Sequence, residues 1–361
     1  MSCERALPSI PGLAPVDQEQ LDRIALLIVH YNTPEQTERC IHSALRAGFR
    51  KIHLLDNASS TQSLALLEEG LSDHEPRIEL HRSSRNLGFA GGCNRLVRIL
   101  LERSEPHTGR ATGQGSAYDW VFLLNSDTEL NLGAIPALLD ALREHPGHLI
   151  AARMHRPEHQ EGDAIESLGL CCYRSLIAGN RKELDDPCIG PTGGCALLPF
   201  RLLHDLNREH GHLFDDDFFC YAEDFDLAVR ARLLGYDVHY LDSMLAWHEG
   251  QASVSQRDFI TYHGLRNSVW VHLKCFPLGV LISCLPWLLA AHAGSVLRLV
   301  LQRRFALLYR IYRDTLLRAP EMLRKRRRIL RNVPRARIEI LKACISPRFY
   351  ERGYLRRSLK R

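Results

Sequence analysis

Short apolar runs alternate with stretches of helical periodicity over the first 155 residues. The apolar runs predict strands, and the stretches between them predict helices, at 24–29, 34–47, 51–55, 61–70, 77–81, 90–102, 120–124, 134–144 and 148–152. The runs are apolar at nearly every position, which is typical of strands covered on both faces in a parallel sheet. Because strands and helices alternate, the pattern predicts βαβ units with right-handed crossovers.

The pattern changes after residue 155. Short strands and turns precede a predicted helix at 223–234 and a strand at 238–241. Residues 275–297 then carry no formal charge, which is enough length to span a bilayer. Pro286 lies near the middle of this run, so the run predicts either one span or two shorter helices in the membrane interface.

These changes divide the chain into three parts. We expect a loose lead-in at 1–21, an α/β domain at 22–272 and a helical C-terminal region at 273–361. Within the domain, the regular alternation ends at residue 155, so the halves 22–155 and 156–272 are expected to differ in role. The fold class is α/β, with a mostly parallel central sheet flanked by helices.

The charge is distributed unevenly. The 361 residues are 45% hydrophobic and 25% charged, which excludes a disordered or fibrous chain. The net charge is +5, yet from residue 301 onward 20 Lys and Arg face only four Asp and Glu. An acidic body with a basic end, lacking aromatic residues within its most basic run, argues against a nucleic-acid binder. Arg residues among Leu, Ile and Tyr favour an anionic membrane surface instead.

Cysteine usage indicates the compartment. The eleven cysteines are scattered and form no C-x-x-C pair, which argues against a thiolate zinc site and favours reduced cytosolic thiols. The first 20 residues lack the apolar segment of a signal peptide. We therefore expect a cytoplasmic protein, peripherally attached to the inner face of the cell membrane or inserted through 275–297.

Polar residues follow the predicted strands, at the sheet edge where open α/β folds bind ligands. After the first four strands of the expected sheet come Tyr31-Asn32, Asp56-Asn57, a glycine-rich turn at 85–94 and Asn125-Ser126-Asp127. A carboxylate can accept hydrogen bonds from a ribose or base, and glycines let the backbone approach a phosphate. A carboxylate in this position can also hold Mg²⁺ bridged to a diphosphate.

Two further groups carry possible chemistry. Glu223, Asp226 and Arg230 fall at i, i+3 and i+7 of a predicted helix, a spacing that is typical of a surface charge ladder. Asp224 points away from this ladder and is a candidate base in a cleft. The helix N-terminus favours an ionised Asp224. His248 is a candidate metal ligand, although a lone histidine is more often structural.

Seven motifs in order give these residues a context. They are VHYNTPEQTERCIHSAL, LLDNASS, RNLGFAGGCN, LLNSDTEL, GPTGGCALLPF, FDDDFFCYAEDFDLAVRARLLGYDV and AWHEG. Over residues 22–275 the chain resembles the family-2 inverting glycosyltransferases of GT-A fold, and within them the bacterial rhamnosyltransferase-like branch of cell-envelope polysaccharide synthesis. The usual aspartate-x-aspartate motif stands here as Asn125-Ser126-Asp127, which leaves the metal more dependent on Asp127.

The resemblance implies a role for each site residue. It implies a nucleotide-binding half at 22–155 and an acceptor half at 156–272. Nucleotide-sugar contacts are implied for Tyr31, Asn32, Asp56, Asn86, Gly88, Gly91, Ser126, Gly193 and Gly194. It further implies Mg²⁺ or Mn²⁺ at Asp127 and His248, a general base at Asp224 beside Glu223, and an acceptor side near Asp216 and Asp217.

The expected reaction is transfer of a sugar, with L-rhamnose from dTDP-rhamnose the leading interpretation, to a hydroxyl of a glycan or lipid-linked glycan. Alternatives within enzymes are a family-2 transferase using a UDP- or GDP-sugar, a polyprenyl-phosphate glycosyl synthase and a nucleotidyltransferase. A non-catalytic nucleotide-binding or membrane scaffold protein is an alternative of another class, against which the presence of both Asp127 and Asp224 argues.

Overall fold

A nine-stranded mixed sheet forms the centre of the molecule. The computed structural model describes residues 17–72, 77–104, 117–157, 164–250 and 257–351. The strand order is β3-β2-β1-β4-β10-β6-β11-β5, with β7 beside β6. The bounds are β1 Ile24–His30, β2 Ile52–Asp56, β3 Ile78–Arg82, β4 Trp120–Asn125, β5 Thr128–Leu130, β6 Leu149–His155, β7 Ile165–Ser167, β10 Cys195–Pro199 and β11 Val238–His248.

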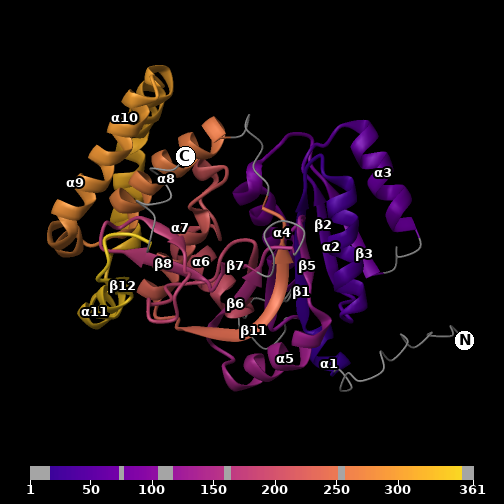
Figure 1. Cartoon of the computed structure of the whole chain (residues 1–361). Helices are drawn as coiled ribbons and strands as arrows, with labels where there is room; N and C mark the ends of the chain where they lie inside the picture. Colours follow the sequence, from indigo (N-terminus) through magenta and orange to yellow (C-terminus); the bar gives the residue numbers. More distant parts are fainter. Residues whose placement is uncertain (1–16, 73–76, 105–116, 158–163, 251–256, 352–361) are drawn as a thin grey trace, which may run out of the picture.

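Helices cover both faces of this sheet (Figure 1). They are α2 Pro34–Arg46, α3 Thr61–Leu71, α4 Gly88–Ser104, α5 Ile135–Glu144, α6 Phe200–His210 and α7 Glu223–Leu234, with a short α1 Gln18–Asp22 at the start. Strand β1 shows the layering, because Ile24 and Leu26 join the core under α2, α3 and α5, whereas Ala25 and Leu27 join the core under α4, α6 and α7. Alternate side chains of a strand point to opposite faces, so an apolar run fills both cores.

The expected α/β fold with a mostly parallel sheet is confirmed for β1 to β4, which pair in parallel. Strand β10 was not expected from the pattern. It inserts antiparallel between β4 and β6, and the single sheet therefore runs through both 22–155 and 156–272. The run CALLP is short and apolar, but nothing in it indicates the antiparallel place between β4 and β6 that its tertiary pairing gives it. The division into three parts remains a prediction.

The C-terminal region is helical, as expected. It contains α8 Arg257–Cys275, α9 Leu278–Leu301, α10 Phe305–Ile329 and α11 Arg335–Ala343, on the side of the molecule away from α2 and α3 (Figure 1). A small second sheet joins β12 Ile345–Ser346, β8 Leu170–Tyr173 and β9 Ala178–Asn180. Of the two alternatives for the apolar run, a pair of shorter helices is wrong, because α9 continues through Pro286 as one helix. Among the described residues, α9 alone is long and apolar enough to cross a membrane.

The cysteines of the described residues are all free, and most are buried. Burial raises the pKa of several of these thiols, including Cys195 to about 12, so they remain protonated. They behave as small apolar core residues.

Candidate active site

The loops that follow β1 and β2 are tied together. Asn32 adopts a left-handed backbone conformation (φ 56°). Its backbone N–H donates to the Ser59 hydroxyl at 3.0 Å, and its side-chain oxygen accepts from the Ser60 N–H at 2.8 Å. Tyr31 is 46% exposed beside this contact, whereas Asp56 is buried at the end of β2 and accepts from the Ser59 N–H. The three predicted nucleoside residues therefore lie at one edge of the sheet.

Asn57 organises the glycine-rich turn. Its side-chain amide donates to the Asn86 side chain and to the Gly88 carbonyl, both at 3.1 Å, and its side-chain oxygen accepts from the Leu87 N–H at 2.9 Å. Gly88 has a φ of +71°, and a Cβ there would lie 2.3 Å from the Phe219 carbonyl oxygen. Glycine is therefore required at Gly88, where the turn contacts the segment before α7. A Cβ on Gly91 would lie 2.9 Å from the Leu87 Cβ.

Asp127 and His248 face each other across 3.2 Å, from the end of β4 and the end of β11. Burial raises the pKa of Asp127, but the hydrogen bond to His248, the charge of that histidine and two backbone hydrogen bonds together lower the pKa below its ordinary value. Burial lowers the pKa of His248, and the same contact raises it above its ordinary value. The Asn125 side chain lies 3.5 Å from His248, and the Asn125 backbone N–H donates to the Gly194 carbonyl at 3.0 Å. Ser126 lies nearby, 3.5 Å from the Thr33 hydroxyl.

Asp224 lies on the other side of the same glycine turn. Its carboxylate accepts from the Gly193 N–H at 3.0 Å and from the Phe225 N–H at 2.7 Å. Glu223 is buried beside it, with one carboxylate oxygen that has no hydrogen-bond partner. Burial raises the pKa of both carboxyls, and the neighbouring charge of Asp224 raises that of Glu223 further. The pair therefore retains a proton more readily than isolated carboxyls do.

The backbone before α7 is strained. Phe219, Tyr221 and Ala222 all have φ between 64° and 66°. The Cys220 N–H donates to the Phe218 carbonyl at 2.8 Å, which closes a γ-turn of the rare kind at Phe219. Left-handed conformations of this sort cost about 1–3 kcal/mol each and persist only when their surroundings hold them.

Side chains of helix α8 hold this strained segment in place through hydrogen bonds. The Asn267 side-chain amide donates to the carbonyls of Phe218, Cys220 and Tyr221 at 3.0, 2.8 and 2.7 Å. Its neighbour Arg266 donates to the Phe218 carbonyl at 3.2 Å. This contact was not predicted from the sequence, because 46 residues separate Asn267 from Tyr221.

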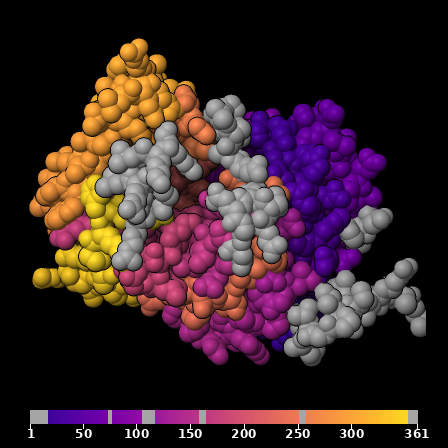
Figure 2. Space-filling view, in the orientation of Figure 1, coloured from indigo at the N-terminus to yellow at the C-terminus, as the bar shows by residue number. Residues whose placement is uncertain are grey.

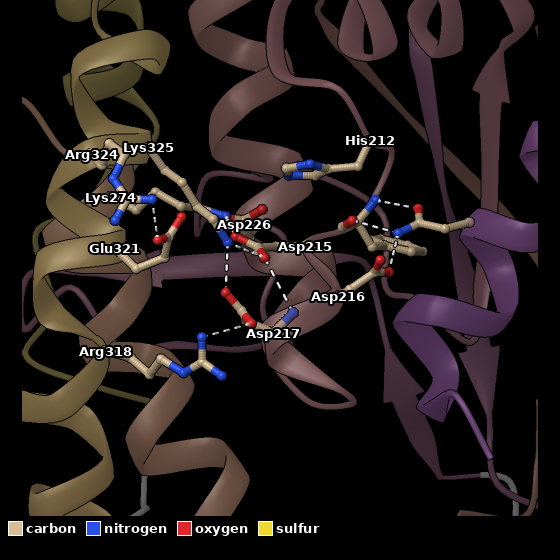
Figure 3. Close-up of polar contacts among 12 residues, drawn as sticks. His212, Asp215, Asp216, Asp217, Asp226, Lys274, Arg318, Glu321, Arg324 and Lys325 are labelled. Atoms are coloured by element: carbon tan, nitrogen blue, oxygen red, sulfur yellow. Dashed lines mark hydrogen bonds and ion pairs between the residues drawn. The ribbon is translucent and has the colours of Figure 1, made fainter. Parts of the chain in front are cut away.

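The three consecutive aspartates before this segment point to different neighbours (Figure 3). Asp216 accepts from the Asn94 side chain on α4 at 2.6 Å. Asp217 binds Lys325 on α10 at 2.8 Å and lies 3.8 Å from Arg318. Asp217 also lines a pocket of about 250 Å³ between α8 and α10. The predicted acceptor residues are thus joined to α4 on one side and to α10 on the other.

Asp215 lies at the centre of a buried ion network. It binds Lys274 at 2.7 Å and Lys325 at 2.6 Å, and Lys274 also binds Asp226 at 2.7 Å. Burial raises the pKa of Asp215, but the two lysines outweigh it and hold that pKa well below its usual range. Asp226 also binds the buried Arg230 at 2.8 Å. Asp226 and Arg230 therefore do not form a surface charge ladder, because both side chains are fully buried.

A second group of possible metal ligands lies within strands β2 and β3 and not in the loops that follow them. Ligand atoms of His53, Glu79 and His81 come within 4.8 Å of one another on β2 and β3. Arg103 binds both carboxylate oxygens of Glu79, at 2.7 and 2.5 Å. A guanidinium in this position opposes a cation, so the cluster does not compete with Asp127 and His248 as the site that the sequence predicts.

Sequence comparison agrees with the motifs. The family model described as "Glycosyl transferase family 2" matches residues 25–206. The chain is 27% identical over 246 residues to "N-acetylglucosaminyl-diphospho-decaprenol L-rhamnosyltransferase" of two Mycobacterium tuberculosis strains, an alignment that covers 63% of this chain and 76% of the relative.

Solved structures give weaker likenesses. A TarS fragment from S. aureus in complex with UDP aligns with a TM-score of 0.47 and 16% identity, over 70% of this chain and 65%, less than two thirds, of the fragment. A mannosyltransferase from Pyrobaculum calidifontis in complex with GDP-Man and Mn²⁺ aligns with a TM-score of 0.46 and 15% identity, over 87% of this chain and 90% of the other. On the family match and the order of its motifs, this chain belongs to glycosyl transferase family 2 and is a rhamnosyltransferase-like glycosyltransferase.

Proposed function

We propose that the protein transfers L-rhamnose from dTDP-rhamnose to a hydroxyl of a lipid-linked glycan, with inversion at the sugar, in cell-envelope polysaccharide synthesis. One observation carries the proposal. The glycine turn Gly193-Gly194 contacts Asp224 on one side and Asn125 on the other, and Asn125 in turn lies beside the Asp127–His248 pair. In this proposal, the general base and the site for the diphosphate lie on the two sides of one glycine turn. The named activity of the mycobacterial relatives supports the choice of sugar and acceptor.

Asp224 is the general base in this proposal. An acceptor hydroxyl is a poor nucleophile at neutral pH, and a carboxylate that removes its proton during attack contributes typically about 10²–10⁴-fold. The Gly193 N–H fixes one oxygen of Asp224, and the Phe225 N–H fixes the other. Glu223 holds a proton beside it, which keeps a second negative charge away from the departing diphosphate.

The residues at Asp127 and His248 fit a divalent cation. A half-buried carboxylate and an imidazole point at each other across 3.2 Å, and a carboxylate is a ligand type that suits both Mg²⁺ and Mn²⁺. Mg²⁺ or Mn²⁺ bound there would neutralise charge on the diphosphate, a role for which one or two protein carboxylates suffice. Asp127 supplies the anionic oxygen ligand of this pair.

The donor pocket is assigned to the edge formed by the first three loops. Tyr31, Asn32 and Asp56 bind the nucleoside, and the turn at Asn86, Gly88 and Gly91 approaches the nucleotide through its backbone. Ser126 contacts the nucleotide sugar, and Gly193 and Gly194 form the floor under the donor sugar. Hydrogen bonds among Asn32, Ser60, Asn57 and Asn86 support this assignment, because they fix the loops before a ligand arrives.

The acceptor is assigned to the side of Asp216 and Asp217. Asp217 lines a pocket between α8 and α10, and α9 and α10 lead from it to the most apolar and basic parts of the chain. An anionic membrane surface at the cytoplasmic face is the partner that fits these helices and a lipid-linked acceptor.

Thermal stabilisation by nucleotides tests the proposal. The purified full chain is melted with dTDP, UDP or GDP, each with Mn²⁺ or with EDTA. A ligand at about 100 times its dissociation constant adds about 2.7 kcal/mol, which gives a visible shift. Stabilisation by dTDP above the others, in Mn²⁺ only, is the expected result. Preference for UDP or GDP would replace the sugar but keep the mechanism, and no stabilisation by any nucleotide would contradict the donor site.

A further inference from the structure

The outward face of α9 is apolar along its whole length. Leu278, Ile282, Leu289 and Leu297 are each 57% to 64% exposed, and they recur at helical spacing on one face. Arg298 is the only formally charged residue of the helix. Surface helices of globular proteins normally show a polar outer face, and a continuous exposed apolar stripe marks an interaction surface.

The opposite face of α9 is fixed to the body of the protein. Val280 and Cys284 are buried in a core shared with α7, α8 and α10. The Arg174 guanidinium lies 3.8 Å above the Trp287 ring, and Leu299 is fully buried near the other end of the helix. The helix is therefore held against the protein along both its halves, and it presents only one side outward.

These two faces decide between the two ways an apolar helix meets a membrane. A helix of 24 residues is about 36 Å long and can cross a bilayer when hydrocarbon surrounds it. Crossing would pull α9 away from its buried contacts or draw Arg174 into hydrocarbon, where a charge is costly. We infer that α9 lies flat in the interface of a lipid bilayer, with Leu278, Ile282, Leu289 and Leu297 toward the acyl chains. This inference deepens the membrane association of the proposed function and rests on it.

The charges near the hairpin between α9 and α10 favour a bilayer as the occupant over a second copy of the chain. Arg298 and Arg303 are exposed near the turn, where Phe305 and Tyr309 are 57% and 67% exposed. The hairpin projects beyond the rest of the molecule (Figure 2). Arginine and aromatic side chains beside an apolar stripe match anionic headgroups above acyl chains, whereas two copies would bring like charges together.

The same helices reach the site. Helix α10 packs along α8 and binds Asp215 and Asp217 through Lys325 (Figure 3). Helix α8 holds the segment before Glu223 through Asn267. A membrane against α9 therefore sets the orientation of the acceptor side relative to the lipid surface, because α9 packs against α10 and α10 binds Asp215 and Asp217.

Vesicle flotation tests whether the apolar face of α9 binds a lipid bilayer. The full chain is mixed with vesicles of phosphatidylglycerol and phosphatidylcholine, alongside the double variant Ile282→Glu, Leu289→Glu. We expect at least tenfold weaker flotation for this variant. Leu66→Glu is the matched control, because Leu66 is 45% exposed on the distant helix α3. Equal binding by all three proteins, or no binding by the native chain, would overturn the inference.

Depth measurements separate lying flat from crossing. Tryptophan is placed singly at Ile282, Leu289 or Leu297, and its fluorescence is quenched by lipids brominated near the headgroup or near the chain end. The unsubstituted protein gives the background of the native tryptophans. A flat helix gives three similar, shallow depths. A spanning helix places Leu289, at its middle, deepest, and that result would overturn the inference.

Two further readouts keep the outcomes distinct. Sedimentation in the absence of lipid detects self-association, and a dimer that the double variant abolishes, without vesicle binding, would assign the stripe to a second copy and overturn the inference. Nucleotide-dependent thermal stabilisation of the double variant shows that it is folded and has its donor site. If the double variant loses vesicle binding but is still stabilised by nucleotide, the defect lies in the apolar face of α9 alone. This outcome is therefore distinguishable from failure of the proposed transferase function.

Discussion

The side-chain amide of Asn267 donates to the backbone carbonyl of Tyr221 at 2.7 Å, and the same amide also reaches the carbonyls of Phe218 and Cys220. One side chain on α8 thus secures a strained segment that leads directly into the Glu223-Asp224 pair. Strain of this kind is typical of sites where side chains must be held in one geometry.

Replacing Asn267 with leucine removes the donor but keeps the volume. We expect kcat to fall about 10–100-fold with little change in KM, because displacement of a catalytic group by about 1 Å can cost 10²-fold. The stoichiometry of nucleotide binding separates this from partial unfolding, since it stays at one site per chain when the protein is folded. Adding Ala222→Gly relieves a left-handed residue and is expected to restore part of kcat. A fall in kcat that matches a fall in binding stoichiometry would contradict a positioning role.

Asp224→Asn tests the base. The asparagine keeps the size of the side chain but cannot accept the acceptor proton, so transfer is expected to fall about 10²–10⁴-fold. Donor binding, measured by calorimetry, is expected to remain within a few-fold of that of the native chain. Turnover at the native rate would exclude Asp224 as the base, and Asp216→Asn provides a comparison at a carboxylate that contacts α4 instead.

The raised pKa of Glu223 predicts an alkaline limb in the pH profile. As pH rises through this raised value, Glu223 ionises beside Asp224, and both activity and stability are expected to fall. The sign follows from linkage, since a group whose folded pKa lies above its unfolded value loses its stabilising contribution as pH rises through the folded pKa. Glu223→Gln resembles the protonated form, so it is expected to remain active at neutral pH and to lack the alkaline limb. Melting curves and rates collected at a series of pH values measure both, and identical profiles for the two proteins would contradict this assignment.

Asp127→Ala tests the cation site. We expect weaker nucleotide binding in the presence of Mn²⁺ and unchanged binding in EDTA, because the lost carboxylate acts through the cation. Titrations of the nucleotide with and without the metal check this directly. Equal weakening in both conditions would mean that Asp127 has a structural role through His248.

Lys274→Met tests the buried ion network. The methionine leaves Asp226 and Asp215 with one cationic partner fewer in the interior, and breaking a buried pair in this way costs about 3–5 kcal/mol. Lys325→Met is the matched control, because Lys325 is more exposed and Lys274 still neutralises Asp215. Chemical denaturation is expected to show a smaller loss, about 1 kcal/mol, for this second variant. Equal losses would contradict the central role of Lys274.

The hydrophobic periodicity of the sequence was sufficient to predict the first strands of the sheet and the helix between them. The apolar runs before Tyr31 and Asp56 are buried strands, and Pro34 at the first position of α2 begins that helix as expected. Local pattern determines these elements because parallel strands bury both faces and helices repeat every 3.6 residues. The motifs likewise determined the family, since the order of seven short segments needs no tertiary information.

Only the tertiary structure decided what surrounds the site. The place of strand β10 between β4 and β6 comes from antiparallel pairing, which its short apolar run does not indicate. Asn267, Lys274 and Lys325 were not identified in sequence because their partners lie 46 to 110 residues away. The direction of the apolar face of α9 was undetermined for the same reason. Which side of a uniformly apolar helix packs against the protein depends on neighbours that the local sequence does not encode.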